Sequence, residues 1–333
     1  MKVGVSIHFR NPEQWFKPWD QLFKEEMELA VLSDKLGYDT LWCYEHHFTE
    51  DGHIPSPMAV CSAILSRTKR IEVGPNLIMP LHDPVMIAEE SAVIDLISGG
   101  RFLLGMVQGY RPEEYGAWGI DLKERGPRVS EAVDIIRRCW SGEKFSYEGK
   151  FWKYKDVKCV PPPHRNPIPI LYGARTKRAL RRAAEVGIGI ISQGEGVESA
   201  KSYAQACREL GKKPGEVRHL RYIHVSEDPG RAWSKVKDHA LYMMRMYEKW
   251  INPAGDPGLY GIPQGSELTA ENLMNSPMYI ICTPSEAIKR INQLKAEYPL
   301  DELWGLFHFP GLDAQMVADT LELFANKVAP HIR

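Results

Sequence analysis

The sequence lacks the features that would place the protein in several specialised classes. It has no apolar run long enough to span a bilayer and no block of like charges. The formal net charge is −1, so nothing indicates a surface for nucleic acid or for an anionic membrane. The six cysteines are scattered and form no C-x-x-C pair, which argues against structural zinc and favours a reducing, cytoplasmic location.

Several common catalytic motifs are also missing. The chain has no G-x-G-x-x-G after a strand, no P-loop, no G-x-S-x-G elbow and no H-E-x-x-H. A dinucleotide fold, a phosphate-loop enzyme, a serine hydrolase of the elbow type and a zinc protease are therefore not expected. Any active site must be found from other signals.

Strand-like and helix-like segments alternate along all 333 residues. The strand candidates begin near Lys2, Thr40, Ile71, Arg101, Ile168, Ile188, His219 and Glu302. Between them lie apolar stripes at helical spacing, at Phe23, Met27, Ala30 and Val31, at Val129, Ala132, Val133, Ile136 and Trp140, and at Val317, Leu321, Phe324 and Val328. Eight such units favour a closed (β/α)₈ barrel over an open doubly wound sheet, and we expect a single domain over residues 1–333.

Two segments interrupt this rhythm and predict insertions after strand four and before strand eight. Residues Gly142–Asn166 hold aromatic residues and prolines, which favours a small hairpin before the fifth strand. Residues Asn252–Pro277 are rich in proline, glycine and asparagine. A loop of that length is either a lid over the active site or a surface insertion without a role.

The strongest chemical signal is the run Trp42–Phe48, in which a short apolar strand ends on Glu45, His46 and His47. In α/β proteins the C-terminal ends of the strands carry the chemistry. Neighbouring strand residues point to opposite faces, so at most one of the two histidines faces the crevice, which disfavours a metal site. The interpretation that we adopt is an acid/base pair of Glu45 and His46, against the alternative of a histidine bonded to the backbone at a strand end.

An ordered set of segments resembles the bacterial luciferase-like flavin monooxygenases. The resemblance begins with Gly37–Glu50 and continues almost to the C-terminus. The other segments that carry it are Val73-Gly74, Met79–Pro84, Ala88–Glu90, Asp95–Gly105, Gly109–Tyr115, Tyr172–Thr176, Ala183–Gly187 and Thr283–Ala287. Each segment alone is a weak signal, but their order along the chain is specific.

The resemblance implies a (β/α)₈ barrel that binds reduced FMN (FMNH₂) or, in some branches, deazaflavin F420. In the luciferase-like branch a separate flavin reductase supplies FMNH₂, which reacts with O₂ to a C4a-peroxyflavin that oxidises a small organic substrate. The family commonly forms dimers, so a homodimer is expected. These properties lead to the hypothesis of a two-component flavin monooxygenase.

The resemblance also implies site residues. His46 matches the catalytic histidine and Glu45 its acidic neighbour, while Asn76, or the bond between Pro75 and Asn76, falls where the family has a non-prolyl cis peptide under the flavin. Gln108, Tyr110 and Gln193 are expected to line the flavin. Gln108 stands where bacterial luciferase has an arginine, and Arg111 is a candidate to replace that charge.

A phosphate site is expected at Gly173-Ala174-Arg175-Thr176, a strand-to-helix junction whose free N–H groups and helix dipole suit an anion. Arg128 matches a family arginine that helps to bind this phosphate. The alternative interpretation of Thr176 is an ordinary helix cap among surface arginines.

Two rival functions stay open. One is an F420-dependent dehydrogenase or reductase that transfers a hydride on the same fold. The other is a non-catalytic flavoprotein subunit, which the presence of Glu45, His46 and the phosphate-loop residues disfavours.

Overall fold

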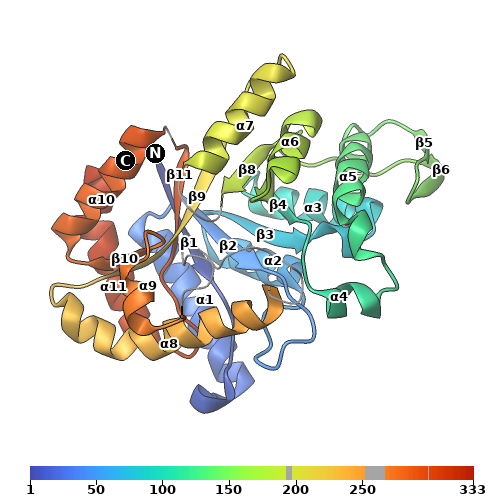
Figure 1. Cartoon of the computed structure of the whole chain (residues 1–333). Coiled ribbons are helices and arrows are strands. Elements are labelled where there is room, and N and C mark those ends of the chain that lie inside the picture. Colours follow the sequence, from blue (N-terminus) through green and yellow to red (C-terminus); the bar gives the residue numbers. More distant parts are fainter. Residues whose placement is uncertain (193–196, 252–266, 299) are drawn as a thin grey trace.

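The computed structural model describes residues 1–192, 197–251, 267–298 and 300–333, and Figure 1 shows a barrel of strands enclosed by helices. The barrel strands are all parallel and run in the order β9 (Val217–Val225), β11 (Glu302–Leu306), β1 (Lys2–Ile7), β2 (Thr40–Tyr44), β3 (Glu72–Ile78), β4 (Leu104–Val107), β7 (Ile170–Ala174) and β8 (Gly189–Ser192). Since β8 pairs again with β9, the barrel is closed by eight strands. This confirms the expected (β/α)₈ fold.

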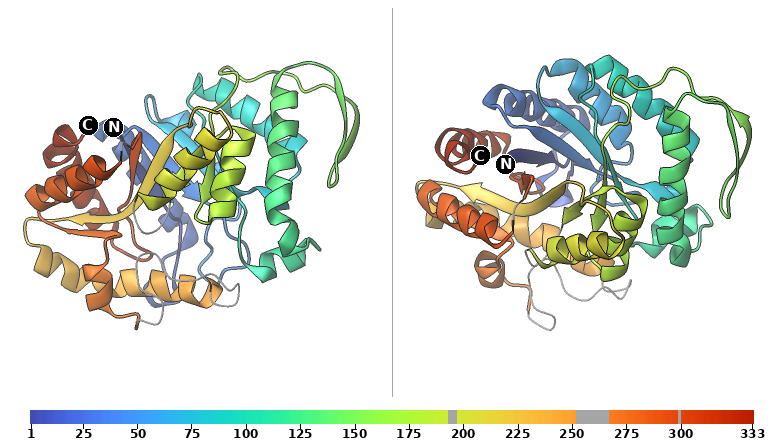
Figure 2. Two further views of the ribbon diagram at one scale, coloured as in Figure 1. Left: turned by 45° about the horizontal axis from the view of Figure 1, so that its top comes forward. Right: turned by 90° about the horizontal axis from the view of Figure 1, so that it is seen from above.

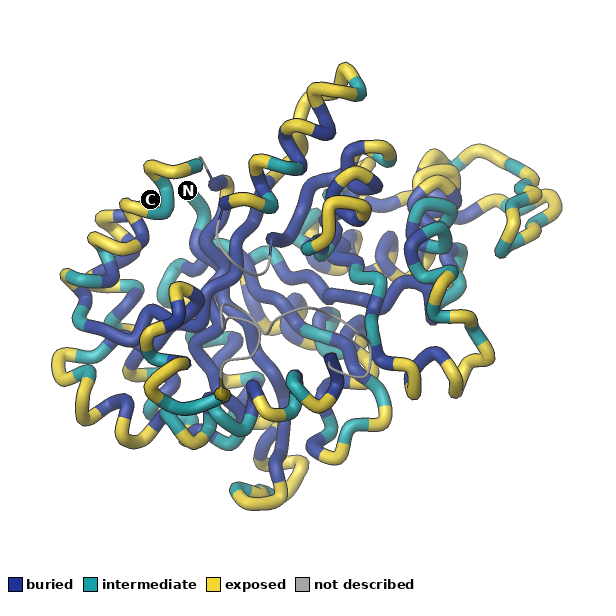
Figure 3. Tube along the Cα trace, in the orientation of Figure 1, coloured by how far each residue is buried: buried dark blue, intermediate teal, exposed yellow. Residues whose placement is uncertain are grey.

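Helices cover the outside of the barrel, as the view from above in Figure 2 shows. The longer ones are α1 (Trp19–Leu36), α2 (Pro57–Arg67), α3 (Pro84–Ser98), α5 (Arg125–Trp140), α6 (Lys177–Val186), α7 (Glu198–Glu209), α8 (Pro229–Ile251), α10 (Pro284–Glu297) and α11 (Ala314–Lys327). Shorter helical pieces are η1 (Glu13–Trp15), η2 (Met79–Leu81), α4 (Pro112–Ala117), η3 (Leu122–Glu124), α9 (Ala270–Asn275) and η5 (Ala329–His331). The strands are the most buried part of the chain (Figure 3).

The barrel interior is filled by large side chains that need glycine opposite them. A Cβ atom at Gly74 would lie 2.8 Å from the Trp42 ring, and one at Gly105 would lie 2.9 Å from the same ring. The indole N–H of Trp42 donates to Thr40 Oγ1 and to Glu302 Oε1, both at 3.1 Å. The two glycines therefore make room for a tryptophan that the interior holds by hydrogen bonds.

Each of the eight predicted strands corresponds to a barrel strand, but a ninth parallel strand was missed. This strand, β10 (Tyr279–Cys282), pairs with the last four residues of β9 rather than extending the closed circuit. The expected hairpin is present as β5 (Phe145–Glu148) and β6 (Lys153–Val157), which stand away from the barrel in Figures 1 and 2. Of the expected lid segment, residues 252–266 lie outside the described residues, and the remainder includes the short helix α9.

The predicted inner face of α1 is confirmed only in part. Ala30 is buried and Met27 packs against the core, but Phe23 is exposed, and the residues that face the barrel include Glu26 and Ser33. Polar side chains occupy this face because each has a partner: Glu26 lies 3.0 Å from His308 Nδ1, and Ser33 donates to Leu29 O. The predicted stripes of α5 and α11 are confirmed, since all of their named residues are buried.

Candidate active site

His46 lies just beyond the end of β2 and is buried at the C-terminal rim of the barrel. Its Nδ1 atom lies 2.9 Å from Glu114 Oε1, a side chain supplied by α4. The same carboxylate oxygen accepts the backbone N–H of His47 at 2.9 Å and lies 3.1 Å from Arg111 Nη1. Three donors therefore converge on one oxygen and fix the orientation of the His46 ring.

The charge state of Glu114 determines which nitrogen of His46 carries a proton. Burial raises the pKa of Glu114, but the hydrogen bond and charge of His46, the His47 N–H and Arg111 outweigh it and lower that pKa. An ionised Glu114 can only accept hydrogen bonds, so Nδ1 of His46 is the donor. In the neutral ring the Nε2 atom is then the acceptor nitrogen, and it lies 3.4 Å from the hydroxyl of Tyr110.

Glu45 does not contact His46, which corrects the expected acid/base pair. Its Oε1 atom lies 3.0 Å from His47 Nε2 and 2.7 Å from His82 Nε2, and its other oxygen accepts the N–H of Ile78. Residues 45 and 46 are adjacent in sequence, and adjacent positions at a strand end point in opposite directions. Glu45 thus joins the ends of β2 and β3 outside the barrel, and Glu114 takes the place expected for it beside His46.

Asn76 lies inside the barrel on β3, opposite Tyr44 of β2 and Gly105 of β4. Among the described residues its side-chain oxygen and nitrogen have no hydrogen-bond partner, although the residue is buried. The expected cis peptide is absent: within the described chain the cis bonds are Val160–Pro161 and Asn166–Pro167. The Pro75–Asn76 bond is trans because β3 continues through it, with regular pairing to both neighbouring strands.

A basic pocket of about 280 Å³ opens where β4 and β7 end. Gln108 and Thr176, both predicted cofactor-binding residues, line it together with Lys123, Arg125, Arg178 and Arg182. Backbone from the first turn of α5, at Gly126 and Pro127, completes the wall. Four cations, two helix N-termini and no carboxylate among its described lining residues make this pocket suited to a phosphate group.

The closed parallel barrel agrees with the comparison with known families. The model of the luciferase-like monooxygenase family matches residues 1–296. The chain belongs to this family. Its relatives include both flavin-dependent monooxygenases and F420-dependent dehydrogenases.

Two relatives and one solved structure illustrate the range of the luciferase-like family. The chain is 29% identical to the F420-dependent glucose-6-phosphate dehydrogenase of Amycolatopsis mediterranei, over 99% of both chains. It is also 29% identical to the oxygenase component of the flavin-dependent trigonelline monooxygenase of Acinetobacter baylyi, over 99% of this chain and 95% of the relative. The monooxygenase RslO1 from Streptomyces bottropensis superposes over 100% of both chains with a TM-score of 0.86 at 24% identity, which supports the fold.

Arg128 and Arg111 do not lie where the family resemblance predicts. Arg128 is not among the described residues that line the basic pocket; its guanidinium lies over the ring of Phe151 at 4.6 Å and 3.5 Å from Glu124. Arg111 contacts Glu114 and lies 4.8 Å above the ring of Trp250, so it does not replace the charge missing at position 108. Arg125 and Arg182 supply positive charge at that pocket instead.

The remaining predicted residues lie at or near the same rim. Gly173 and Ala174 end β7, and a Cβ at Gly173 would lie 2.7 Å from Val107, so this strand end approaches β4 closely. Arg175 follows and is partly buried, whereas Thr176 accepts the N–H of Ala179 and caps α6, which agrees with the alternative interpretation of an N-cap. Gln193 lies outside the described residues.

Several residues of the site were not identified from the sequence. Glu114 and Arg182 each lie on a helix, and their roles depend on contacts with other elements. A Cβ at Gly126 would lie 2.5 Å from the Arg182 guanidinium, so α5 and α6 must pack together before that charge is placed. The one available signal was Glu114 itself, a carboxylate three residues after Arg111 at the start of a short helix.

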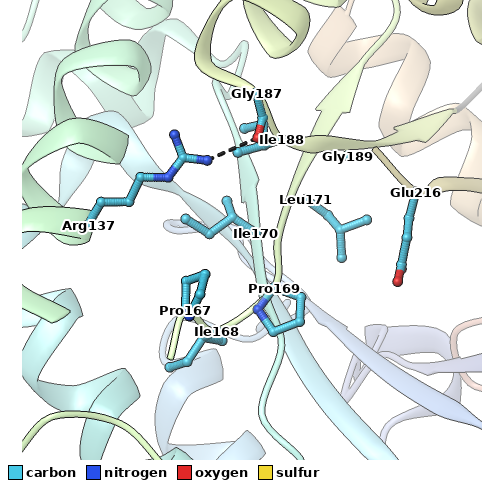
Figure 4. Close-up of a pocket in the computed structure, with 10 residues that line it drawn as sticks. All are labelled: Arg137, Pro167, Ile168, Pro169, Ile170, Leu171, Gly187, Ile188, Gly189 and Glu216. Atoms are coloured by element: carbon cyan, nitrogen blue, oxygen red, sulfur yellow. Dashed lines mark hydrogen bonds between the residues drawn. The ribbon is translucent and has the colours of Figure 1, made fainter. Parts of the chain in front are cut away.

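A second pocket, of about 220 Å³, lies at the opposite end of the barrel (Figure 4). It is lined by the start of β7 and β8, and Arg137 at its edge donates to the carbonyl oxygens of Val186 and Gly187. Because the chemistry of such barrels belongs to the strands' C-terminal ends, this pocket is not part of the active site.

The described residues contain no group of three or more histidine, cysteine, aspartate or glutamate side chains placed to hold a metal ion. They also contain no helix that is both long and apolar enough to cross a membrane.

The contacts of Glu45 with His47, His82 and the backbone of Ile78 should make the stability of the protein sensitive to acid. Burial raises the pKa of Glu45, but the charge of His82 and the hydrogen bonds from His47, His82 and Ile78 lower it from 4.5 to about 2. The stabilisation is therefore present above pH 4.5 and is lost as the pH falls toward 2. We expect Glu45→Gln to lower the free energy of unfolding at pH 7 and to weaken its pH dependence below pH 4.5, as measured by urea denaturation. An unchanged pH dependence would show that Glu45 is not ionised in the folded state.

Proposed function

We propose that this protein is the oxygenase component of a two-component flavin monooxygenase, which uses FMNH₂ from a separate reductase and O₂ to oxidise a small organic substrate. The observation that carries the proposal is the His46–Glu114 contact of 2.9 Å, which leaves His46 Nε2 as the reactive nitrogen at the barrel rim. An imidazole whose orientation is fixed by a carboxylate suits proton transfer in this chemistry.

The residues at the rim fit FMN. The phosphate would be held in the basic pocket by Arg125, Arg178 and Arg182 with the N-terminus of α6. The unpartnered amide of Asn76 inside the barrel offers both a donor and an acceptor to the polar edge of a flavin ring. Reduced FMN with O₂ would supply the oxygen-transfer chemistry.

In this proposal His46 holds or moves a proton through Nε2 while Glu114 keeps the ring in position and stabilises its protonated form. The ring centroid of Tyr110 lies 5.5 Å from that of His46, and its hydroxyl is on the Nε2 side of the imidazole. Glu45 acts more remotely, because it fixes the end of β2 through His47 and His82. It is a positioning residue in our proposal.

The second candidate is an F420-dependent hydride transfer, because one relative of nearly full length is an F420-dependent dehydrogenase. The basic pocket does not separate the two cofactors, since both carry phosphate. Two buried arginines near the rim favour the monooxygenase over a dehydrogenase that acts on a phosphorylated sugar. Arg10 forms an ion pair with Asp51 at 2.6 Å and Arg111 one with Glu114 at 3.1 Å, so each positive charge is already matched by a carboxylate.

Anaerobic titration with FMNH₂ and, in parallel, with reduced F420 tests the proposal. We expect tight binding of FMNH₂ and, after addition of O₂, substrate oxidation coupled to flavin oxidation, measured as product formed per flavin oxidised. Arg182→Met removes a charge-assisted hydrogen bond and should weaken FMN binding by about 10- to 100-fold. Arg138→Met on the exposed face of α5 is the control. Preference for F420 without oxygen consumption would contradict the proposal, and no cofactor binding would favour a non-catalytic subunit.

We also propose that the protein is a homodimer formed through α3. Met86, Val93, Leu96 and Ile97 are exposed along one side of this helix, and a symmetric pairing of two copies would bury the stripe against itself. Ile97→Lys is expected to produce monomers, as measured by sedimentation velocity. Phe16→Lys is the matched control, because Phe16 is 57% exposed and Ile97 59%. If the Ile97→Lys and Phe16→Lys variants both sediment with the same mass as the unaltered protein, the proposed α3 interface is contradicted.

We propose a cytoplasmic location, which agrees with a flavin reductase as partner. All six cysteines are buried and free, as expected for a chain that folds under reducing conditions.

A further inference from the structure

We propose that His8 and His53 form a hydrogen-bonding wall beside His46, and that this wall selects an uncharged, compact cyclic substrate carrying a carbonyl or hydroxyl oxygen. The inference rests on the proposed function and specifies its substrate class. Neither histidine was identified from the sequence as part of the site.

The three imidazoles come from different parts of the chain and meet at the rim. His8 directly follows the end of β1, and His53 lies in the loop between β2 and α2. The centroid of the His53 ring lies 4.8 Å from that of His46 and 5.8 Å from that of His8. All three side chains are buried, so they form one continuous polar surface inside the protein.

His8 and His53 have hydrogen-bonding capacity that the protein does not use. Within the described part of the chain, neither ring nitrogen of either residue has a partner. A buried polar group without a partner costs about 1–3 kcal/mol, so four such atoms gathered beside His46 favour a surface that binds a polar group of a ligand. A bound molecule that presents an oxygen to these nitrogens would satisfy part of this capacity.

Both histidines are neutral in this environment. Burial lowers the pKa of each well below 6.5, and the nearby charge of Arg10 lowers both further. A neutral imidazole offers one N–H donor and one acceptor nitrogen. Together the two rings can donate to a carbonyl oxygen or exchange hydrogen bonds with a hydroxyl group, but they provide no charge for an anion.

The neighbouring arginines do not provide that charge either. Arg10 and Asp51 are both buried and 2.6 Å apart, and the Tyr242 hydroxyl also donates to Asp51 at 3.0 Å. Arg111 is paired with Glu114 in the same way. Each cation is matched by a carboxylate, so a carboxylate or phosphate substrate would bring a second, unbalanced negative charge into a buried site, which is costly.

Aromatic rings complete the surface. Tyr44 stacks on His8 with centroids 5.2 Å apart and on Trp304 at 5.3 Å, and Trp250 of α8 lies 5.1 Å from the His46 ring. Flat rings of this kind favour an aromatic or alicyclic body over a long flexible chain. The oxygen of such a molecule would face His8 and His53, and its ring would lie near His46.

The test compares three probes of similar size: acetophenone with a carbonyl, ethylbenzene without oxygen and benzoate with a charge. Binding to the full chain, with and without oxidised FMN, is measured by calorimetry. We expect acetophenone to bind most tightly and benzoate most weakly. His53→Phe should weaken acetophenone binding by about tenfold and leave ethylbenzene unchanged, whereas His53→Asn should retain part of the affinity. His8→Phe should behave like His53→Phe.

His239→Phe is the matched control, because His239 stacks on Trp15 outside this cluster. An equal loss for acetophenone and ethylbenzene in the His53 variants would indicate a purely structural role and overturn the proposal. Tighter binding of benzoate, or binding of none of the probes, would overturn it as well. Acetophenone binding with no flavin binding would instead refute only the proposed function.

Discussion

Replacing His46 with asparagine is expected to lower the rate of substrate oxidation by about a hundredfold or more, with little change in the affinity for FMNH₂. General acid/base groups contribute factors of about 10² to 10⁴. The reason is geometric: Glu114 holds Nδ1 at 2.9 Å, so Nε2 is the nitrogen free to exchange a proton. Single-turnover measurements with preloaded FMNH₂ separate this loss from any loss of cofactor binding.

The control for this prediction is the neighbouring residue, His47→Asn. Its ring contacts Glu45 rather than Glu114, and only its backbone N–H faces the site. We expect its turnover to stay within a few-fold of the unaltered protein. Glu114→Gln should share much of the His46 effect and should also shift the pH–rate profile, because the carboxylate that favours protonated His46 is lost. Equal turnover of the unaltered protein and the His46 variant would remove His46 from the chemistry.

The place of His46 at the end of a strand could be predicted from the sequence, whereas its contacts could not. The end of β2 could be predicted because an apolar run stops abruptly on titratable side chains, and strand ends in barrels carry function. Glu45 was assigned to His46 because the two are adjacent in the sequence. The structure separates them, since adjacent residues at a strand end point apart, and brings in Glu114 from 68 residues away.

The same reason explains the other differences. Thr176 and Gln108 were found because they lie next to strands whose pattern is clear, but Arg182 lines the basic pocket only through the packing of α6 on α5. β10 was missed because it is short and pairs only with the last four residues of β9. Patterns along one segment predict that segment's own structure, and contacts between distant segments need the fold.

Replacing Arg218 with methionine is expected to destabilise the protein by about 3–5 kcal/mol. This is the usual cost of removing one member of a buried ion pair, because the other charge is left buried without a partner. Arg218 and Glu302 lie inside the barrel, where Nη1 and Oε2 are 2.8 Å apart and neither side chain is more than 1% exposed. Urea denaturation measures the change. Arg181→Met on the surface of α6 is the control and should cost less than about 1 kcal/mol, because its partners Glu185 and Glu209 are half exposed.

The double variant Arg218→Met/Glu302→Leu should recover most of the lost stability, since it removes both buried charges together. The pH dependence gives a second test. Burial raises the pKa of Glu302 even with Arg218 present, and removing Arg218 raises it further. A raised pKa means that folded Glu302 keeps a proton at a pH where the unfolded chain has released it. The stability of the Arg218→Met variant should therefore fall as the pH rises above about 4.5. The double variant should lack this pH dependence of stability. If the Arg218→Met variant is as stable as the unaltered protein, water must reach Glu302 inside the barrel.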